Sequence, residues 1–183
     1  MQDSRAPGIR PRPTPWRRLD ALARRVAPAA WTALLLLLAG APLGVPGGPG
    51  LRSAAALGCV FFWSLARPAS MSPLPVFLLG LLCDLLDLAP PGVAVLVLLV
   101  AHGLAVRWRP ALAHRGFAPV WLAFAAVAAG AAALEWALAG LLAWRVPPAG
   151  DAVRQAVLAI GLYPVLAAPF ARAHRGPAAP ELA

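Results

Sequence analysis

Ionisable residues inside otherwise apolar segments are the side chains of this sequence that could do chemistry. The stretch FLLGLLCDLLDLAPPGV, residues 77–93, carries Asp84 and Asp87 and ends on a Pro-Pro-Gly turn. Glu135 lies within a second apolar stretch and His102 within a third. A carboxylate in hydrocarbon is costly unless a partner, a backbone group or water satisfies it. These residue types therefore indicate buried hydrogen bonds and ion pairs, which serve structure or partner binding.

The other reactive side chains do not form a recognisable site. Cys59 and Cys83 lack the CxxC spacing of redox or zinc motifs, so we expect them to be small buried residues. His102, His114 and His174 are too scattered for a zinc site. The serines lack a Gly-x-Ser-x-Gly elbow, and the sequence has no glycine-rich phosphate loop. We therefore expect no catalytic residue, no metal site, no cofactor and no enzymatic activity.

The spacing around the first two acids predicts how they are held. Gly80 and Asp84 are four residues apart, so on a helix they share one face. A glycine there lets a neighbouring backbone approach closely. We expect Asp84 to bond into a neighbouring helix or into the backbone of the following turn, where Gly92 opens the next helix. Asp87 lies one turn nearer the helix end, and we expect it to be a solvated cap that reaches the outer headgroups.

Glu135 lies on a stripe of small residues. Its face at helical spacing consists of alanines, namely Ala125, Ala128, Ala132 and Ala139. This stripe suits tight helix packing, with Glu135 as a polar link across the interface. His102 could pair with either acid, Asp84 or Glu135. The three residues then either satisfy one another inside the bundle or contribute to partner binding.

The composition indicates a membrane protein. Of the 183 residues, 61% are hydrophobic and 13% are charged, whereas about a quarter of an ordinary soluble domain is charged. The mean hydropathy is +0.73. The 21 prolines and 16 glycines do not indicate disorder, because disorder requires low hydrophobicity. We therefore predict an all-α integral membrane protein, with proline and glycine in its helices and turns.

Apolar runs between Pro/Gly turns predict a bundle of about six transmembrane helices. Their expected bounds are 26–44, 51–66, 73–88, 93–108, 117–144 and 153–170. Several of these runs hold about sixteen residues, fewer than the twenty or so that cross the hydrocarbon. The third and fourth could instead form one re-entrant hairpin, which would leave four full crossings, and the first could be a cleaved signal peptide. We prefer six crossings.

The arginines orient this bundle. The formal net charge is +9, and all 16 basic residues are arginine. With a cytoplasmic N-terminus, thirteen arginines fall on the inner side and three on the outer side, as the positive-inside rule requires. We expect a cytoplasmic Pro/Arg-rich tail over 1–25, attracted to anionic lipid, a six-helix domain over 26–175 and a cytoplasmic tail over 176–183. Nucleic-acid binding is the weaker alternative, because no stacking platform accompanies the arginines.

A Gly-x-x-x-Asp-Leu helix at Gly80 and Asp84 leads through a short turn to Gly92-Val93. The aromatic pair Phe62-Trp63 closes the helix before it, and the aromatic-proline pair Tyr163-Pro164 precedes a basic stretch near the end of the chain. The order of these motifs resembles the rod shape-determining protein MreD family over roughly residues 27–175, and the last of them is similar to the family's final helix. Two features depart from the family: Leu51-Arg52 lacks the proline of an arginine-proline pair, and the N-terminal tail is longer.

The resemblance implies a non-enzymatic component of the bacterial inner membrane that acts in cell elongation and peptidoglycan synthesis, and so in the regulation of cell shape. The implied partners are an MreC-like periplasmic protein, an MreB-like actin homologue, a RodA-like glycosyltransferase and the elongation transpeptidase. The implied fold is similar to the substrate-binding subunits of energy-coupling-factor transporters. A vitamin-binding membrane subunit is therefore the rival interpretation, although the short, proline-rich outer loops offer few groups to hold a vitamin.

Overall fold

The computed structural model describes residues 15–40, 48–87, 90–112, 115–144 and 146–174, which form six α-helices. In chain order these are α1 (Pro15–Ala39), α2 (Gly48–Ala66), α3 (Pro73–Asp87), α4 (Val93–Leu112), α5 (Phe117–Ala143) and α6 (Ala149–His174). The described residues are thus all-helical, as predicted. Four helices, α1, α4, α5 and α6, contain stretches long and apolar enough to cross a membrane.

Proline and glycine determine most of the helix ends. α3 begins at Pro73, at a position where the missing N–H of proline is not needed. α3 ends at Asp87 and α4 begins at Val93, on either side of the predicted Pro-Pro-Gly turn. With 15 residues, α3 is about 22 Å long, less than the roughly 30 Å of a bilayer's hydrocarbon core.

α1 differs most from the prediction. It begins at Pro15 and not at Val26, so residues 15–25, predicted as part of a tail, are helical. Pro15 suits the first helical position, and the Arg, Leu and Ala residues that follow are strong helix formers. Pro28, expected in the first turn, lies inside the helix. The rest of the predicted tails, residues 1–14 and 175–183, lies outside the described residues.

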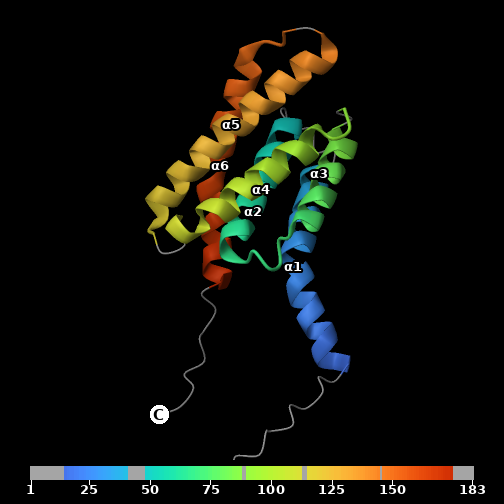
Figure 1. The fold of residues 1–183 in the computed structure, drawn as a ribbon, viewed down its shortest axis with the longest axis vertical. Helices are drawn as coiled ribbons and strands as arrows, with labels where there is room; N and C mark the ends of the chain where they lie inside the picture. Colours follow the sequence, from blue (N-terminus) through green and yellow to red (C-terminus); the bar gives the residue numbers. More distant parts are fainter. Residues whose placement is uncertain (1–14, 41–47, 88–89, 113–114, 145, 175–183) are drawn as a thin grey trace, which may run out of the picture.

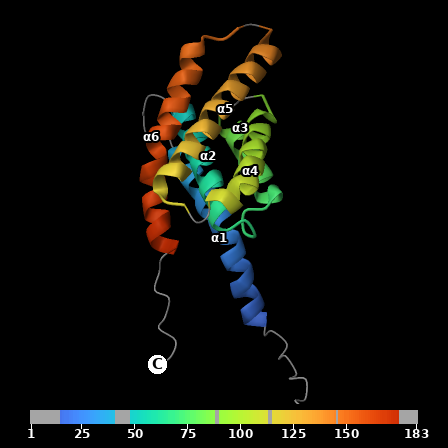
Figure 2. The ribbon, with the colours of Figure 1, turned by 60° about the vertical axis from the view of Figure 1, so that its left-hand side comes forward.

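The six helices form one bundle with α2 at its centre. α2 packs against all five of the other helices. The start of α1 and the end of α6 lie at the same end of the bundle, where α1 extends beyond the other helices (Figures 1 and 2). The α3–α4 and α5–α6 turns lie at the opposite end, which we call the hairpin end. We call the end with the two termini the terminal end.

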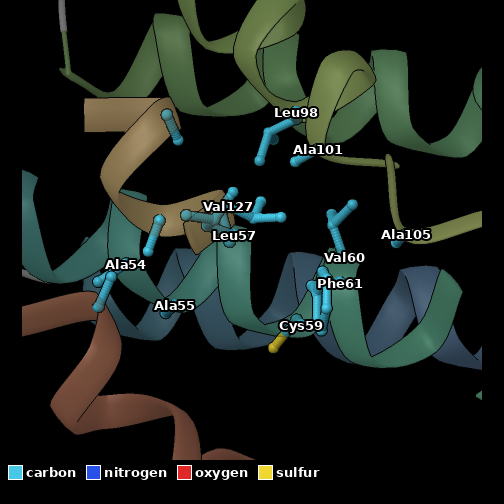
Figure 3. Packing of buried hydrophobic residues seen from close by; sticks show 14 of the residues in the cluster. Ala54, Ala55, Leu57, Cys59, Val60, Phe61, Leu98, Ala101, Ala105 and Val127 are labelled. Atoms are coloured by element: carbon cyan, nitrogen blue, oxygen red, sulfur yellow. The ribbon is translucent and has the colours of Figure 1, made fainter. Parts of the chain in front are cut away.

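The small and apolar residues of α2 form the centre of the hydrophobic core. Every residue from Ala54 to Phe61 is buried, because a helix that is apolar on all sides belongs in the centre of a bundle. Figure 3 shows Leu57 and Val60 of α2 beside Leu98 of α4 and Val127 of α5. Small residues in this segment allow the backbones of neighbouring helices to approach closely.

The outer surface of the bundle is apolar. Large exposed side chains occur on all the helices except α2 and include Leu38, Leu78, Leu96, Leu122, Leu141 and Val165. In water such a surface would mark an interface or an aggregation site, whereas in a bilayer it faces lipid at no cost. The surface and the four long apolar helices together support a helical membrane protein.

Single cysteines would test the topology. Six crossings place Arg115 in the cytoplasm and Val146 outside, and both side chains are exposed. A membrane-impermeant maleimide added to intact spheroplasts should label Val146→Cys but not Arg115→Cys. Cys59 and Cys83 are buried, so the unsubstituted protein supplies the background. Labelling of Arg115→Cys from outside would overturn the six-crossing interpretation in favour of four crossings or a cleaved first helix.

Candidate functional site

Asp84 caps the helix that follows it in the chain. Gly92 N–H donates to its Oδ2 at 2.7 Å and Ala94 N–H donates to its Oδ1 at 2.9 Å. The first N–H groups of α4 have no acceptor within their own helix, and the positive end of the helix dipole favours a carboxylate there. The side chain is buried, with 3% of the residue exposed. The predicted bond to the backbone of the turn is therefore present, and both carboxylate oxygens are used.

Gly80 and Gly92 make this bond geometrically possible. A Cβ atom on Gly80 would lie 2.5 Å from Val95 Cα and 2.9 Å from Val95 N, so any side chain would push α4 away from α3. Gly92 has φ +101°, a left-handed conformation that favours glycine. The close approach predicted for Gly80 is thus confirmed. Gly80, Asp84 and Gly92 form one unit, which we call the α3–α4 hairpin unit.

Asp87 is ion-paired rather than a solvated cap. Arg52 Nε lies 2.7 Å from Asp87 Oδ1, and the Arg52 Nη2 atom contacts the same oxygen. The side chains are 11% and 17% exposed, respectively. The expectation of a solvated cap is therefore wrong. An aspartate at a helix C-terminus opposes the helix dipole, and the arginine from the first turns of α2 offsets that unfavourable charge.

Glu135 joins three helices. Ser53 Oγ of α2 donates to Glu135 Oε1 at 3.1 Å. Gln155 Nε2 of α6 donates both to Glu135 Oε2 and, at 2.9 Å, to Ser53 Oγ. Ala128 and Ala132, on the same face of α5, are buried. Glu135 is thus the polar link across a helix interface that its alanine stripe predicts, and its partners are a serine and a glutamine.

His102 does not pair with an acid. Its Nδ1 atom lies 2.8 Å from Ser64 Oγ, and the Ser64 hydroxyl donates to Val60 O at 2.6 Å. Because the hydroxyl proton is directed to that carbonyl, His102 Nδ1–H is the donor to Ser64. The prediction of an acid partner is wrong for a geometric reason. His102 lies roughly 14 Å along α4 from its first residue, whereas Asp84 is at that first turn. Glu135 is also remote, because it bonds to Ser53, roughly 16 Å along α2 from Ser64.

Tyr163 and Pro164 act in packing. The Tyr163 ring stacks on Phe124 at a centroid distance of 4.2 Å, and Phe61 meets it edge-on at 6.0 Å. Pro164 has no N–H, so the carbonyl of Ile160, four residues earlier, loses its helical donor. Trp121 Nε1–H donates to that carbonyl at 3.1 Å. The aromatic-proline pair thus ties α6 to α2 and α5.

A cavity of about 310 Å³ lies at the hairpin end, between α2, α3, α4, α5 and α6. We call it the hairpin-end cavity. Its walls include all three interior acids, Asp84, Asp87 and Glu135, together with Ser53 and Gln155. The cavity is therefore surrounded by three sets of polar contacts. These are the two bonds between Asp84 and the backbone, the Arg52–Asp87 ion pair, and the hydrogen bonds of Glu135 with Ser53 and Gln155, which we call the Glu135 triad.

Sequence reasoning missed the partners at this site. Arg52 lies 35 residues from Asp87, and Ser53 lies 102 residues from Gln155. No periodicity links residues so far apart. One signal was available, because an arginine within an apolar helix usually has an acidic partner. His102 and Tyr163 lie outside the cavity walls, so the structure does not bring every predicted residue together.

Comparison with known proteins found no matching family model, no matching curated protein and no matching solved structure. The resemblance to the MreD family stays a prediction.

Glycine substitutions would test the α3–α4 hairpin unit. Gly80→Ala should lower the free energy of unfolding by about 1–3 kcal/mol, because the added methyl group overlaps the Val95 backbone. Gly103→Ala, in the same helix pair but with no atom near its Cβ, is the matched control. It should be neutral or stabilising by up to about 1 kcal/mol. Equal stability of the two variants in detergent unfolding experiments would refute the close approach.

A double-mutant cycle would test the Arg52–Asp87 pair. Each alanine substitution should destabilise the protein by about 2 kcal/mol, because it leaves the other charge largely buried. The double variant should lose less stability than the sum of the losses in the two single variants, with a coupling energy above about 1 kcal/mol. The exposed Asp151–Arg154 pair is the control, with a coupling below about 1 kcal/mol. Equal coupling in both cycles would show that the Arg52 pair has no special role.

Proposed function

We propose that this protein is a non-enzymatic integral membrane component of the bacterial cell-elongation machinery, similar in role to MreD. The observation that carries the proposal is the α3–α4 hairpin unit. The residues of the family resemblance, Gly80, Asp84 and Gly92, are in contact with one another or with one turn of backbone. A motif whose members jointly build one structural feature is a more specific match than three separate residues.

The bonding of the interior polar groups supports a scaffolding role. In the described part of the chain, Asp84, Asp87, Glu135 and His102 each bond to another helix or to the backbone of the hairpin turn. Such links hold helices at fixed positions, as a frame that presents its surfaces to other proteins must do. The proposed partners are an MreC-like periplasmic protein, an MreB-like actin homologue, a RodA-like glycosyltransferase and the elongation transpeptidase.

The proposed location is the bacterial inner membrane, with six crossings and both termini in the cytoplasm. The positive-inside distribution of arginine supports this orientation. The positions of α1 and α6 agree with it, because the start of α1 and the end of α6 lie at the same end of the bundle. A chain that crosses the membrane an even number of times has both of its termini on the same side.

Depletion and complementation would test the proposed function. Depletion should make rod-shaped cells round, and the tagged protein should co-purify with an MreC-like protein. Asp84→Leu should restore rod shape poorly, because it removes both bonds to the start of α4. Gly103→Ala, with an open site, should restore it fully. Normal rods after depletion, with no MreC-like protein retained, would refute the scaffold proposal.

The hairpin-end cavity favours a second candidate. A substrate-binding membrane subunit of an energy-coupling-factor-type vitamin transporter would need a cavity that opens at one membrane surface, and this cavity is lined by residues of both turns, such as Pro90 and Pro147. Its volume of about 310 Å³ is at the lower limit for small-molecule pockets. Tight binding of a vitamin, together with normal cell shape after depletion, would favour this candidate over the scaffold.

A further inference from the structure

The hairpin-end cavity combines apolar walls with a few polar groups. Most of its lining residues are apolar, including Leu57 of α2, Val97 of α4 and Ala132 of α5. Trp136 is also in the wall, and its ring position is fixed because its indole N–H donates to Pro147 O at 2.9 Å. A largely preformed, mostly apolar cavity with convergent polar groups is the usual form of a small-ligand site.

The charges around this cavity are predominantly negative. Among the residues that the structure describes, its walls contain four carboxylates and no arginine, lysine or histidine. Arg52 pairs with Asp87 from outside the wall, and Arg154 pairs with Asp151 on the exposed rim. These two arginines leave two carboxylates of the cavity without a basic partner among the described residues.

The two remaining carboxylates differ in how their charge is offset. Asp84 accepts two backbone N–H groups at the start of α4, where the helix dipole supplies roughly half a positive charge. Within the described part of the chain, Glu135 accepts hydrogen bonds only from the neutral side chains Ser53 and Gln155. Of the four cavity carboxylates, Glu135 is therefore the one whose negative charge the described residues offset least.

We propose that the hairpin-end cavity binds an organic cation, an ammonium or guanidinium group on a short apolar stem, with Glu135 as its counter-ion. The cation offsets the uncompensated charge, the apolar walls contact the stem, and Trp136 adds an aromatic surface of the kind that attracts organic cations. A hard metal ion fits less well, because no group of three or more His, Cys, Asp and Glu in the described residues can hold one.

The cation could come from a free small molecule or from a lysine or arginine side chain of a protein at the membrane surface. The chemistry recognised is the same in both cases. The proposal does not rest on the proposed scaffold role, because the cavity and its charges are the same whichever function the protein has.

Pairs of charged and neutral isosteres would test the proposal. The full-length protein in phosphatidylcholine nanodiscs is titrated calorimetrically with n-butylguanidinium against n-butylurea, and with n-butylammonium against 1-butanol. A second arm uses acetyl-Gly-Arg-Gly-amide against the same peptide with citrulline in place of arginine. In at least one arm the cation should bind at least tenfold more tightly than its neutral isostere. Preference only for free cations assigns a small-molecule source, and preference only for the arginine peptide assigns a protein side chain.

Two variants locate the counter-ion. Glu135→Gln keeps an acceptor for Ser53 but removes the charge, and it should abolish the preference for the cation. Asp151→Asn changes a carboxylate that Arg154 already neutralises, and it should reduce the preference by less than threefold. The proposal is overturned if no cation outbinds its isostere in either arm, a result that needs no variant. It is also overturned if Glu135→Gln keeps the tenfold preference.

Discussion

The bond between the Asp84 carboxylate and the first N–H groups of α4 is the contact on which the rest of the structure depends. Burying the Asp84 carboxylate without partners would cost much more free energy than its two hydrogen bonds contribute to stability. For this reason, α4 must begin where Asp84 can reach its backbone. Gly80 then lets α4 lie directly against α3. Because α4 also packs on α2 and α5, its position determines one wall of the hairpin-end cavity. A single side chain thus connects a local turn to the arrangement of the bundle.

Polar contacts at the two ends and small residues between them hold the bundle together. Arg52–Asp87 and the Glu135 triad lie at the hairpin end, whereas the Ser64–His102 bond lies nearer the terminal end. Between them, α2 contributes a run of small and apolar residues. In lipid the hydrophobic effect gives little drive for helices to associate, so close packing and interhelical hydrogen bonds carry more of the stability than they do in water. This explains why the exterior is apolar and the interior holds the charges.

The parts of this structure that could be predicted are those that depend on nearby residues. The proline and glycine residues predicted the ends of α3 and the start of α4. The two N–H groups that bond to Asp84 lie eight and ten residues after it in the chain, within reach of a local pattern. The partners of Asp87 and His102 lie on other helices, and local spacing carries no information about which helix faces which. The first turns of α1 were missed for another reason, because their arginines and the proline-rich stretch before them suggested a tail although Leu and Ala also favour a helix there.

Amide hydrogen exchange at Gly92 and Ala94 tests the central claim most directly. If Asp84 holds the start of α4, these two N–H groups should be protected in the native protein, although they lie in the first turn, where helices usually fray. In Asp84→Leu both should exchange at least about tenfold faster, as expected for the loss of a bond worth about 1.4 kcal/mol, while amides in the middle of α5 stay protected. Unchanged protection of Gly92 and Ala94 in that variant would contradict the account.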